Sequence, residues 1–123
     1  MPDVPVLDQS VLSELQETTG DDPDFVRDLV ETYLADVPLQ LTGIDEAIAA
    51  NDAEALVRPA HTLKSSSITL GALRLGEVSR TLEMTGRSGS LDASARENAA
   101  VAHAEWISVQ QAIDAWLAER TNS

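Results

Sequence analysis

Apolar residues recur every three or four positions along most of the chain, with polar residues between them. This spacing is typical of amphipathic helices, and Asp, Gly and Pro stand where such helices begin or end. We expect five helices: between Asp8 and Gly20, from Pro23 to about Asn51, from the cap Asp52 to Leu70, from Ala72 to about Arg87, and after the cap Asp92. Short connections between long amphipathic helices favour antiparallel neighbours. The predicted fold class is therefore all-α, an antiparallel up-down four-helix bundle with a short additional N-terminal helix.

The apolar positions of each predicted helix fall on one face and define a candidate core. In the second helix we expect this face to include Phe25, Leu29, Tyr33, Leu34, Val37, Leu41, Ile44 and Ile48. In the third it consists of Leu56, Ala60, Leu63, Ser67 and Leu70, and in the last of Ala95, Ala99, Ala102, Trp106, Val109, Ile113 and Trp116. Pro38 and Pro59 lie inside predicted helices, where a proline removes a backbone hydrogen bond and is expected to bend or break the helix.

Composition supports one helical domain. The chain has 123 residues, of which 43% are apolar and 3% aromatic, so the core must be built mainly from aliphatic side chains. We expect a single domain over 1–123, with the bundle core at about 8–120. There is no cysteine, and no apolar stretch approaches the roughly 20 residues of a membrane span. We therefore expect a soluble cytoplasmic protein with no membrane association, and a monomer, because a four-helix bundle closes its own core.

The charge is distributed unevenly. The net charge is −13, which argues against a nucleic-acid partner. Residues 1–54 hold 14 acidic residues and one basic residue, whereas residues 55–123 hold seven of each. Six of the eight basic residues lie between 58 and 96. That segment could face an acidic partner, although ordinary solvated helix faces would give the same pattern.

His61 is the residue best placed for chemistry. On a helical wheel it points roughly 140° away from the centre of the buried face of its helix, toward solvent. Lys64 lies one turn along the helix on the same side, Ser65 is exposed beside it, and Val57 and Ile68 lie at the two ends of this surface. An imidazole with a free pKa of about 6.5 is a nucleophile near neutral pH. An exposed histidine is by itself more often an ordinary surface residue.

Other sites have little support in the sequence. His103 is expected at the boundary of the last helix in a structural role, with Glu105 as the nearby acid. Two histidines without paired acids make a poor metal site. The phosphate-loop pattern G-x-x-x-x-G-K-[ST] is absent, and the acids of the first half are spread around helices rather than paired.

The residues around His61 resemble a known family. The segment His61-Thr62-Leu63-Lys64-Ser65-Ser66-Ser67, followed by Leu70-Gly71-Ala72, is similar to the signature of histidine phosphotransfer (HPt) domains. The likeness continues through Leu75, Leu82-Glu83 and Gly86-Arg87. Upstream it takes in Gly20-Asp21-Asp22-Pro23-Asp24-Phe25, Ala47-Ile48 and Asn51-Asp52, so it covers roughly residues 8–115.

The resemblance implies a phosphoryl carrier of a multistep phosphorelay. His61 would be the phosphoacceptor, Lys64 would stabilise charge beside it, and Ser65 would allow close approach of the partner. Val57, Ser65 and Ile68 would form the docking surface. Glu83 and Arg87 fall near positions that often carry polar groups beside this histidine, and Arg87 would be a supporting group. Partners would be receiver domains of response regulators or hybrid histidine kinases, and these would supply Mg²⁺. The chain would have no nucleotide or metal cofactor of its own and no independent catalytic turnover.

Three departures and two alternatives accompany this interpretation. Many members have Gly where this chain has Ser65. Glu83 stands where some members have Gln, so we expect no direct phosphate role for it, and Pro59 has no obvious explanation. One alternative is a helical docking module that binds a receiver or kinase without carrying phosphate, and another is a structural bundle of a larger assembly. The His61–Lys64 pair favours the carrier over the docking module, and the near-complete signature favours both over the structural bundle. A histidine kinase dimerisation domain would need an ATP-binding domain, for which 123 residues leave no room.

Overall fold

The computed structural model describes residues 4–18, 20 and 22–121. The described chain forms five helices and no strand: α1 (Gln9–Thr18), α2 (Pro23–Ala49), α3 (Ala53–Thr69), α4 (Leu73–Arg87) and α5 (Ala93–Thr121). The predicted fold class is confirmed, with each boundary within a few residues of its expected place. Within these ranges, no helix has the length and apolar character needed to cross a membrane.

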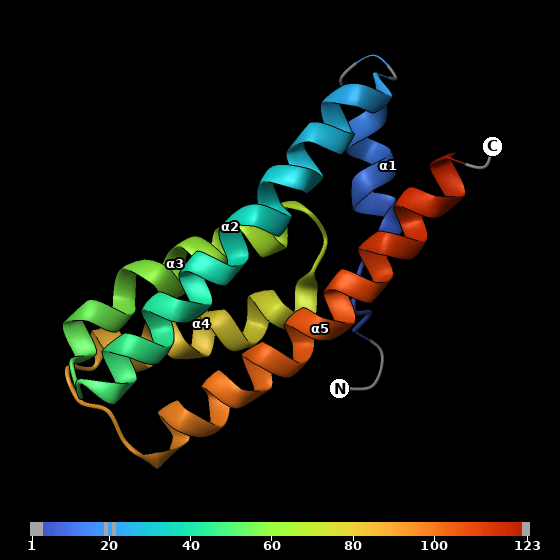
Figure 1. The fold of residues 1–123 in the computed structure, drawn as a ribbon. Helices are drawn as coiled ribbons and strands as arrows, with labels where there is room; N and C mark the ends of the chain where they lie inside the picture. Colours follow the sequence, from blue (N-terminus) through green and yellow to red (C-terminus); the bar gives the residue numbers. More distant parts are fainter. Residues whose placement is uncertain (1–3, 19, 21, 122–123) are drawn as a thin grey trace.

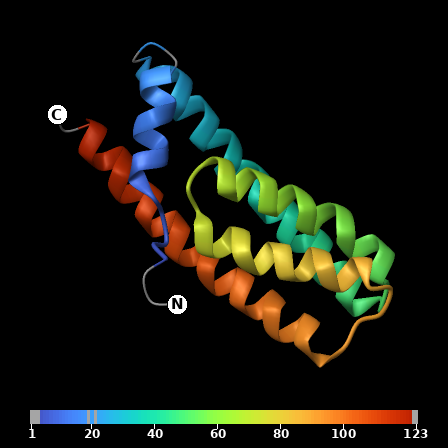
Figure 2. The same cartoon turned by 180° about the vertical axis from the view of Figure 1, so that it is seen from behind.

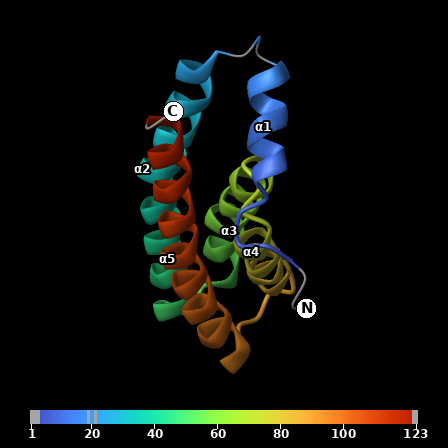
Figure 3. The ribbon, with the colours of Figure 1, turned by 90° about the vertical axis from the view of Figure 1, so that its right-hand side faces the viewer.

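Helices α2 to α5 form the up-down bundle, and α1 extends it (Figures 1 and 2). Because α3 and α4 are shorter than α2 and α5, one half of each long helix projects beyond them. Helix α1 lies in line with the α3–α4 pair beside this projecting part (Figure 3). It is attached to the turn after α3, where the backbone N–H of Asp8 donates to the carbonyl of Gly71 at 2.8 Å. Gly71 has a φ of +87°, which ends α3 where the sequence predicted.

Aspartate caps stand at the starts of α1, α2, α3 and α5, whereas α4 begins after Ala72 without a side-chain cap. The Asp22 carboxylate accepts from the backbone N–H of Asp24 at 3.0 Å, and Asp52 accepts from Ala55 at 3.1 Å. Asp8 and Asp92 do the same for the residues two positions on, at 3.1 and 3.0 Å. Each cap satisfies a backbone donor that has no partner inside its helix, as the sequence predicted. Asp21, part of the predicted start signal of α2, lies outside the described residues.

The predicted buried faces of α3 and α5 are confirmed in full, since all twelve of their residues are buried. The face expected for α2 was wrong at its first residue. Phe25 is 48% exposed, and Val26 and Val30 line the core instead. One residue step turns a helix by about 100°, and at this end of α2 the side toward the core falls on Val26 rather than on Phe25. Val26 continues the spacing that leads to the buried Tyr33.

A polar contact inside the core joins α2 to α3. The hydroxyl groups of Tyr33 and Ser67 are 2.8 Å apart, and the Tyr33 ring meets that of Trp106 edge-on at 5.6 Å. Burial raises the pKa of Tyr33 to about 12, although the hydrogen bond with Ser67 opposes this shift. The tyrosine is therefore neutral at physiological pH, and both buried hydroxyls have a partner.

Both internal prolines lie in helices that continue past them, so of the two outcomes expected at Pro59, a kink or a break, the break does not occur. The Pro59 ring faces Gly43 of α2, where an added Cβ would lie 3.2 Å from the Pro59 Cβ. A ring that occupies the space left by a missing side chain allows α2 and α3 to pack closely. Pro59 therefore has a packing role that the sequence did not reveal.

Two glycines of α4 allow it to approach α3 closely. A Cβ on Gly76 would lie 2.8 Å from Cγ1 of Ile68, and one on Gly86 would lie 2.9 Å from both the Ala53 carbonyl oxygen and Val57 Cγ2. Glu83 lies between these two glycines on the same face of α4 and is buried against α3. This close packing brings Glu83 to the helix that carries His61.

Replacing Gly86 should therefore weaken the α3–α4 contact. We expect Gly86→Ala to lower the free energy of unfolding by about 1–3 kcal/mol, because the new methyl group meets a backbone carbonyl that cannot turn away. Urea unfolding followed by circular dichroism measures this. The exposed Met84 on the same helix provides a control, since Met84→Ala should change stability by less than about 0.5 kcal/mol. Equal stability of the two variants would contradict the close approach.

Candidate functional site

Helix α3 presents His61 to solvent on the side facing α4. Its side chain is 53% exposed, while Ala60 and Leu63, which face the core, are fully buried. Lys64 is half-buried one turn further along, and Ser65 is exposed. Ile68 is 46% exposed, and Val57 is half-buried against Gly86. The structure thus places these five side chains on one surface, as the helical wheel predicted.

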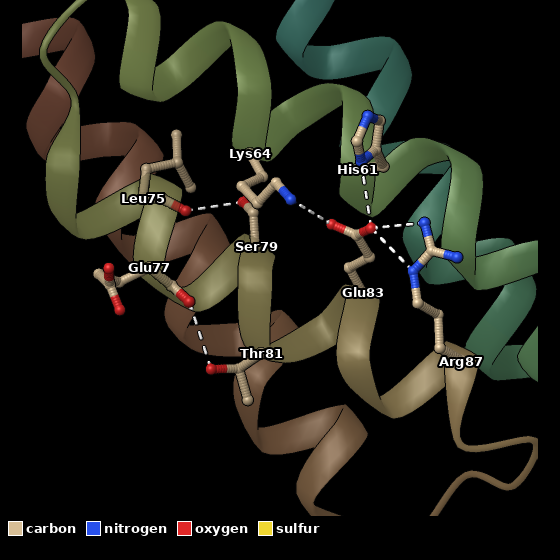
Figure 4. Close-up of polar contacts among 8 residues, drawn as sticks. All are labelled: His61, Lys64, Leu75, Glu77, Ser79, Thr81, Glu83 and Arg87. Carbon is tan, nitrogen blue, oxygen red and sulfur yellow. Dashed lines mark hydrogen bonds and ion pairs between the residues drawn. The ribbon is translucent and has the colours of Figure 1, made fainter.

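A carboxylate from α4 connects the polar groups of this surface (Figure 4). Glu83 Oε2 lies 3.1 Å from Nδ1 of His61 and 2.7 and 2.9 Å from Nη2 and Nε of Arg87. Its other oxygen, Oε1, lies 2.8 Å from Nζ of Lys64. The Glu83 side chain is only 7% exposed because these partners cover it, although the site stands at the surface of the bundle.

Glu83 is ionised over the whole physiological range. The ammonium group of Lys64 is the main reason that the pKa of Glu83 falls from 4.5 to about 2, with Arg87 and His61 lowering it further and burial opposing the shift. Two cations against one carboxylate leave a net positive charge of one beside His61 when the imidazole is neutral. An exposed surface with this charge favours the approach of an anion.

The contact with Glu83 also selects a tautomer of His61. A carboxylate accepts hydrogen bonds and cannot donate them, so the proton of a neutral imidazole resides on Nδ1. Nε2 then carries the free electron pair. Figure 4 shows this second nitrogen on the side of the ring away from Glu83. A ring nitrogen that carries a free electron pair can act as a nucleophile.

The sequence did not reveal the central position of Glu83. It associated Lys64 with His61 directly and gave Arg87 a possible supporting role, whereas both cations contact the carboxylate. The available signal was the spacing of Glu83 and Arg87, four residues apart on one helix face, which permits an ion pair. The resemblance placed both residues near His61, but it did not indicate that Glu83 would contact His61 and both cations. The expectation that Glu83 has no direct phosphate contact stays a prediction.

The second histidine lies elsewhere and differs from its prediction. His103 is exposed rather than at a boundary, and its Nε2 lies 2.8 Å from Oδ2 of Asp45 on α2. The acid beside it therefore comes from the neighbouring helix and not from Glu105. Across residues 4–18, 20 and 22–121, no three His, Cys, Asp or Glu side chains gather as metal ligands would.

Comparison with known proteins identifies the family. A family model described as Hpt domain matches residues 28–119, which is most of the chain. The chain belongs to the Hpt domain family. Its fold is also similar to that of histidine-containing phosphotransfer protein B (HptB) from Pseudomonas aeruginosa PAO1, with a TM-score of 0.83 and 30% sequence identity over 97% of both chains. No curated protein sequence matches the chain significantly.

Membership in the Hpt family indicates the general class of function to which this chain belongs. Hpt domains are phosphocarrier modules of phosphorelays and interact with receiver domains of two-component systems. The Hpt match begins inside α2, whereas the structural similarity extends over nearly the whole chain. The short N-terminal helix is therefore part of an architecture shared with HptB.

The depressed pKa of Glu83 predicts a pH-dependent contribution to stability. A carboxyl group that is more acidic in the folded state stabilises it above pH 4.5, and this contribution is lost as the pH falls toward 2. After allowance for solvent screening we expect about 1–2 kcal/mol. The difference in unfolding free energy between the native chain and Glu83→Gln should shrink by this amount between pH 4.5 and 2.

The exposed Glu77 of α4 supplies the control for this measurement. Glu77→Gln removes the same charge from the same helix without disturbing the contact with His61. The difference in unfolding free energy between Glu77→Gln and the native chain should stay nearly constant over the same pH interval. If the corresponding difference for Glu83→Gln is equally constant, the contacts of Glu83 do not stabilise the fold.

Proposed function

We propose that Nε2 of His61 accepts a phosphoryl group from an aspartyl phosphate of a receiver domain and passes it to an aspartate of another receiver. The observation that carries this proposal is the exposed imidazole whose Nδ1 faces an ionised carboxylate. That contact leaves Nε2 unprotonated and directed outward. The Hpt family supports the general class of reaction, and the geometry of this chain supports the residue and the atom.

Lys64 and Arg87 supply positive charge for the transfer. Both are held close to His61 through Glu83 and remain partly exposed, so an incoming phosphoryl group can interact with them. Positive groups fixed beside a transferring phosphoryl group stabilise charge on its oxygens. We assign Lys64 to this role first, because it is on the same helix as His61, and Arg87 as the supporting cation.

The remaining chemistry belongs to the partner. We propose that the chain acts as a carrier with no ATP site, no metal of its own and no independent turnover. Mg²⁺ would be held by the receiver. Ser65 offers little bulk next to His61, which suits the close approach that in-line transfer requires.

The docking surface would continue along α3 from His61 to Ile68. Ile68 is the large apolar side chain of this surface, and it lines a hollow that also involves α4, α5 and Val4. Val57 contributes at the opposite end, near Arg87. Apolar area at the centre of a contact with charged groups around it is the usual composition of a protein interface.

Transfer from a phosphorylated receiver to the chain tests the proposal. We expect an acid-labile, alkali-stable label on the native chain and none on His61→Gln, because glutamine cannot form the phosphoramidate. Both chains should bind the receiver with similar affinity. If several receivers bind the native chain but never label it, the chain is a docking module that carries no phosphate.

The docking surface can be tested separately from the chemistry. We expect Ile68→Ala to weaken receiver binding about three- to tenfold, as the loss of one partly buried apolar contact would. Ile107 on α5 is 57% exposed and provides a matched control, since Ile107→Ala should leave binding unchanged. Equal effects of the two variants would place the receiver on another face.

A further inference from the structure

We infer that Glu83 keeps a proton on Nδ1 of His61 throughout phosphoryl transfer, so that phosphorylated His61 persists as an imidazolium and remains easy to transfer. This rests on the proposed function and extends it. The proposal assigns Glu83 as a positioning residue that acts through His61 and controls the lability of the bound phosphoryl group.

The bond changes explain why this proton matters. The electron pair on Nε2 forms the N–P bond as the P–O bond of the aspartyl phosphate breaks, and the electron pair of that bond goes to the partner's carboxylate. If Nδ1 keeps its proton, the ring becomes a phosphorylated imidazolium. When the N–P bond later breaks, its electron pair returns to Nε2 and restores a neutral imidazole. No proton moves in either direction.

Loss of the proton would change the leaving group. Without it, breaking the N–P bond would release an imidazolate anion, which is a far poorer leaving group than neutral imidazole. The phosphoryl group would then remain on His61 for longer. Whatever holds the proton on Nδ1 therefore decides whether the phosphorylated histidine acts as a short-lived carrier or as a longer-lived store.

Glu83 is suited to hold this proton. Its Oε2 is 3.1 Å from Nδ1 and is itself fixed by two hydrogen bonds from Arg87. Lys64 holds the other oxygen, so the carboxylate is constrained from both ends. A negative charge at hydrogen-bond distance favours the charged form of a ring that can take a proton. The nearby glycines of α4 keep the carboxylate close to α3.

The other charged groups at the site limit the effect but do not reverse it. Glu83 and Arg87 of α4 and Lys64 of α3 are the charged side chains that form ion pairs in this cluster, and among the described residues no side chain of α2 forms an ion pair with it. The two cations disfavour a positive imidazole, and the carboxylate opposes them at shorter range. Glutamine at position 83 would therefore leave the cations unopposed.

The pH dependence of phosphohistidine hydrolysis tests the inference without a receiver. The native chain is phosphorylated chemically with phosphoramidate, and loss of the label is followed by ³¹P NMR between pH 5 and 9. In Glu83→Gln we expect the midpoint of the hydrolysis profile to fall by at least one pH unit. The half-life at pH 7 should lengthen about tenfold, because each unit reduces the protonated fraction by that factor.

Two further variants separate this role from a general structural one. Glu77→Gln on the same helix should keep the native midpoint, and Glu83→Asp, which retains the charge, should lie closer to the native midpoint than Glu83→Gln does. Circular dichroism confirms that each variant is folded. A rate that changes equally at every pH in Glu83→Gln, with no shift of the midpoint, would overturn the inference.

The outcome is distinguishable from failure of the proposed function. If receivers never label the chain but chemical phosphorylation gives the expected shift at His61, the carrier role fails while the role of Glu83 in holding the proton stands. If receivers label His61 normally and the midpoint does not move, the carrier role stands and this inference is wrong.

Discussion

The site depends on one ionised carboxylate held between two closely packed helices. Glu83 can reach His61 only because Gly76 and Gly86 let α4 approach α3 without side chains between them. Once there, the carboxylate would be costly to bury alone, and Lys64 and Arg87 remove this cost by pairing with it. Backbone packing, charge pairing and the state of the histidine are therefore consequences of the same contact. A change in any of them alters the others.

Much of the fold could be predicted because its signals are local. These signals each depend on a few neighbouring positions: the aspartate caps, the turn at Gly71 and the recurrence of apolar residues every three or four positions. They predicted the helix boundaries with small errors. The buried faces of α3 and α5 followed from helical spacing alone. Phe25 was misplaced because Phe25 and Val26 are both apolar and adjacent, and periodicity does not decide between neighbours where a helix begins.

The site was predicted in part, for the same reason. A helical wheel predicted the exposure of His61 and the positions of Lys64, Ser65 and Ile68 on the same surface, because these features depend on a single helix. The contacts of Glu83 and the pairing of His103 with Asp45 depend on how two helices sit against each other, which no spacing within a helix encodes. Resemblance to the Hpt family indicated His61 as the candidate phosphoacceptor and placed Glu83 and Arg87 near it. It did not predict that the Glu83 carboxylate would contact His61 and both cations at once.

The hydrogen bond between Tyr33 and Ser67 has a consequence for how a partner would recognise the phosphorylated His61 that we propose. Ser67 and His61 are six residues apart, so they lie about 120° apart around the axis of α3. One is fixed to α2 through the core and the other to α4 at the surface. A helix held at two points of its circumference resists rotation about its own axis. We therefore expect a phosphoryl group on His61 to leave the orientation of α3 and the distant faces of the bundle unchanged. A partner would recognise it by direct contact at His61 on a rigid helix.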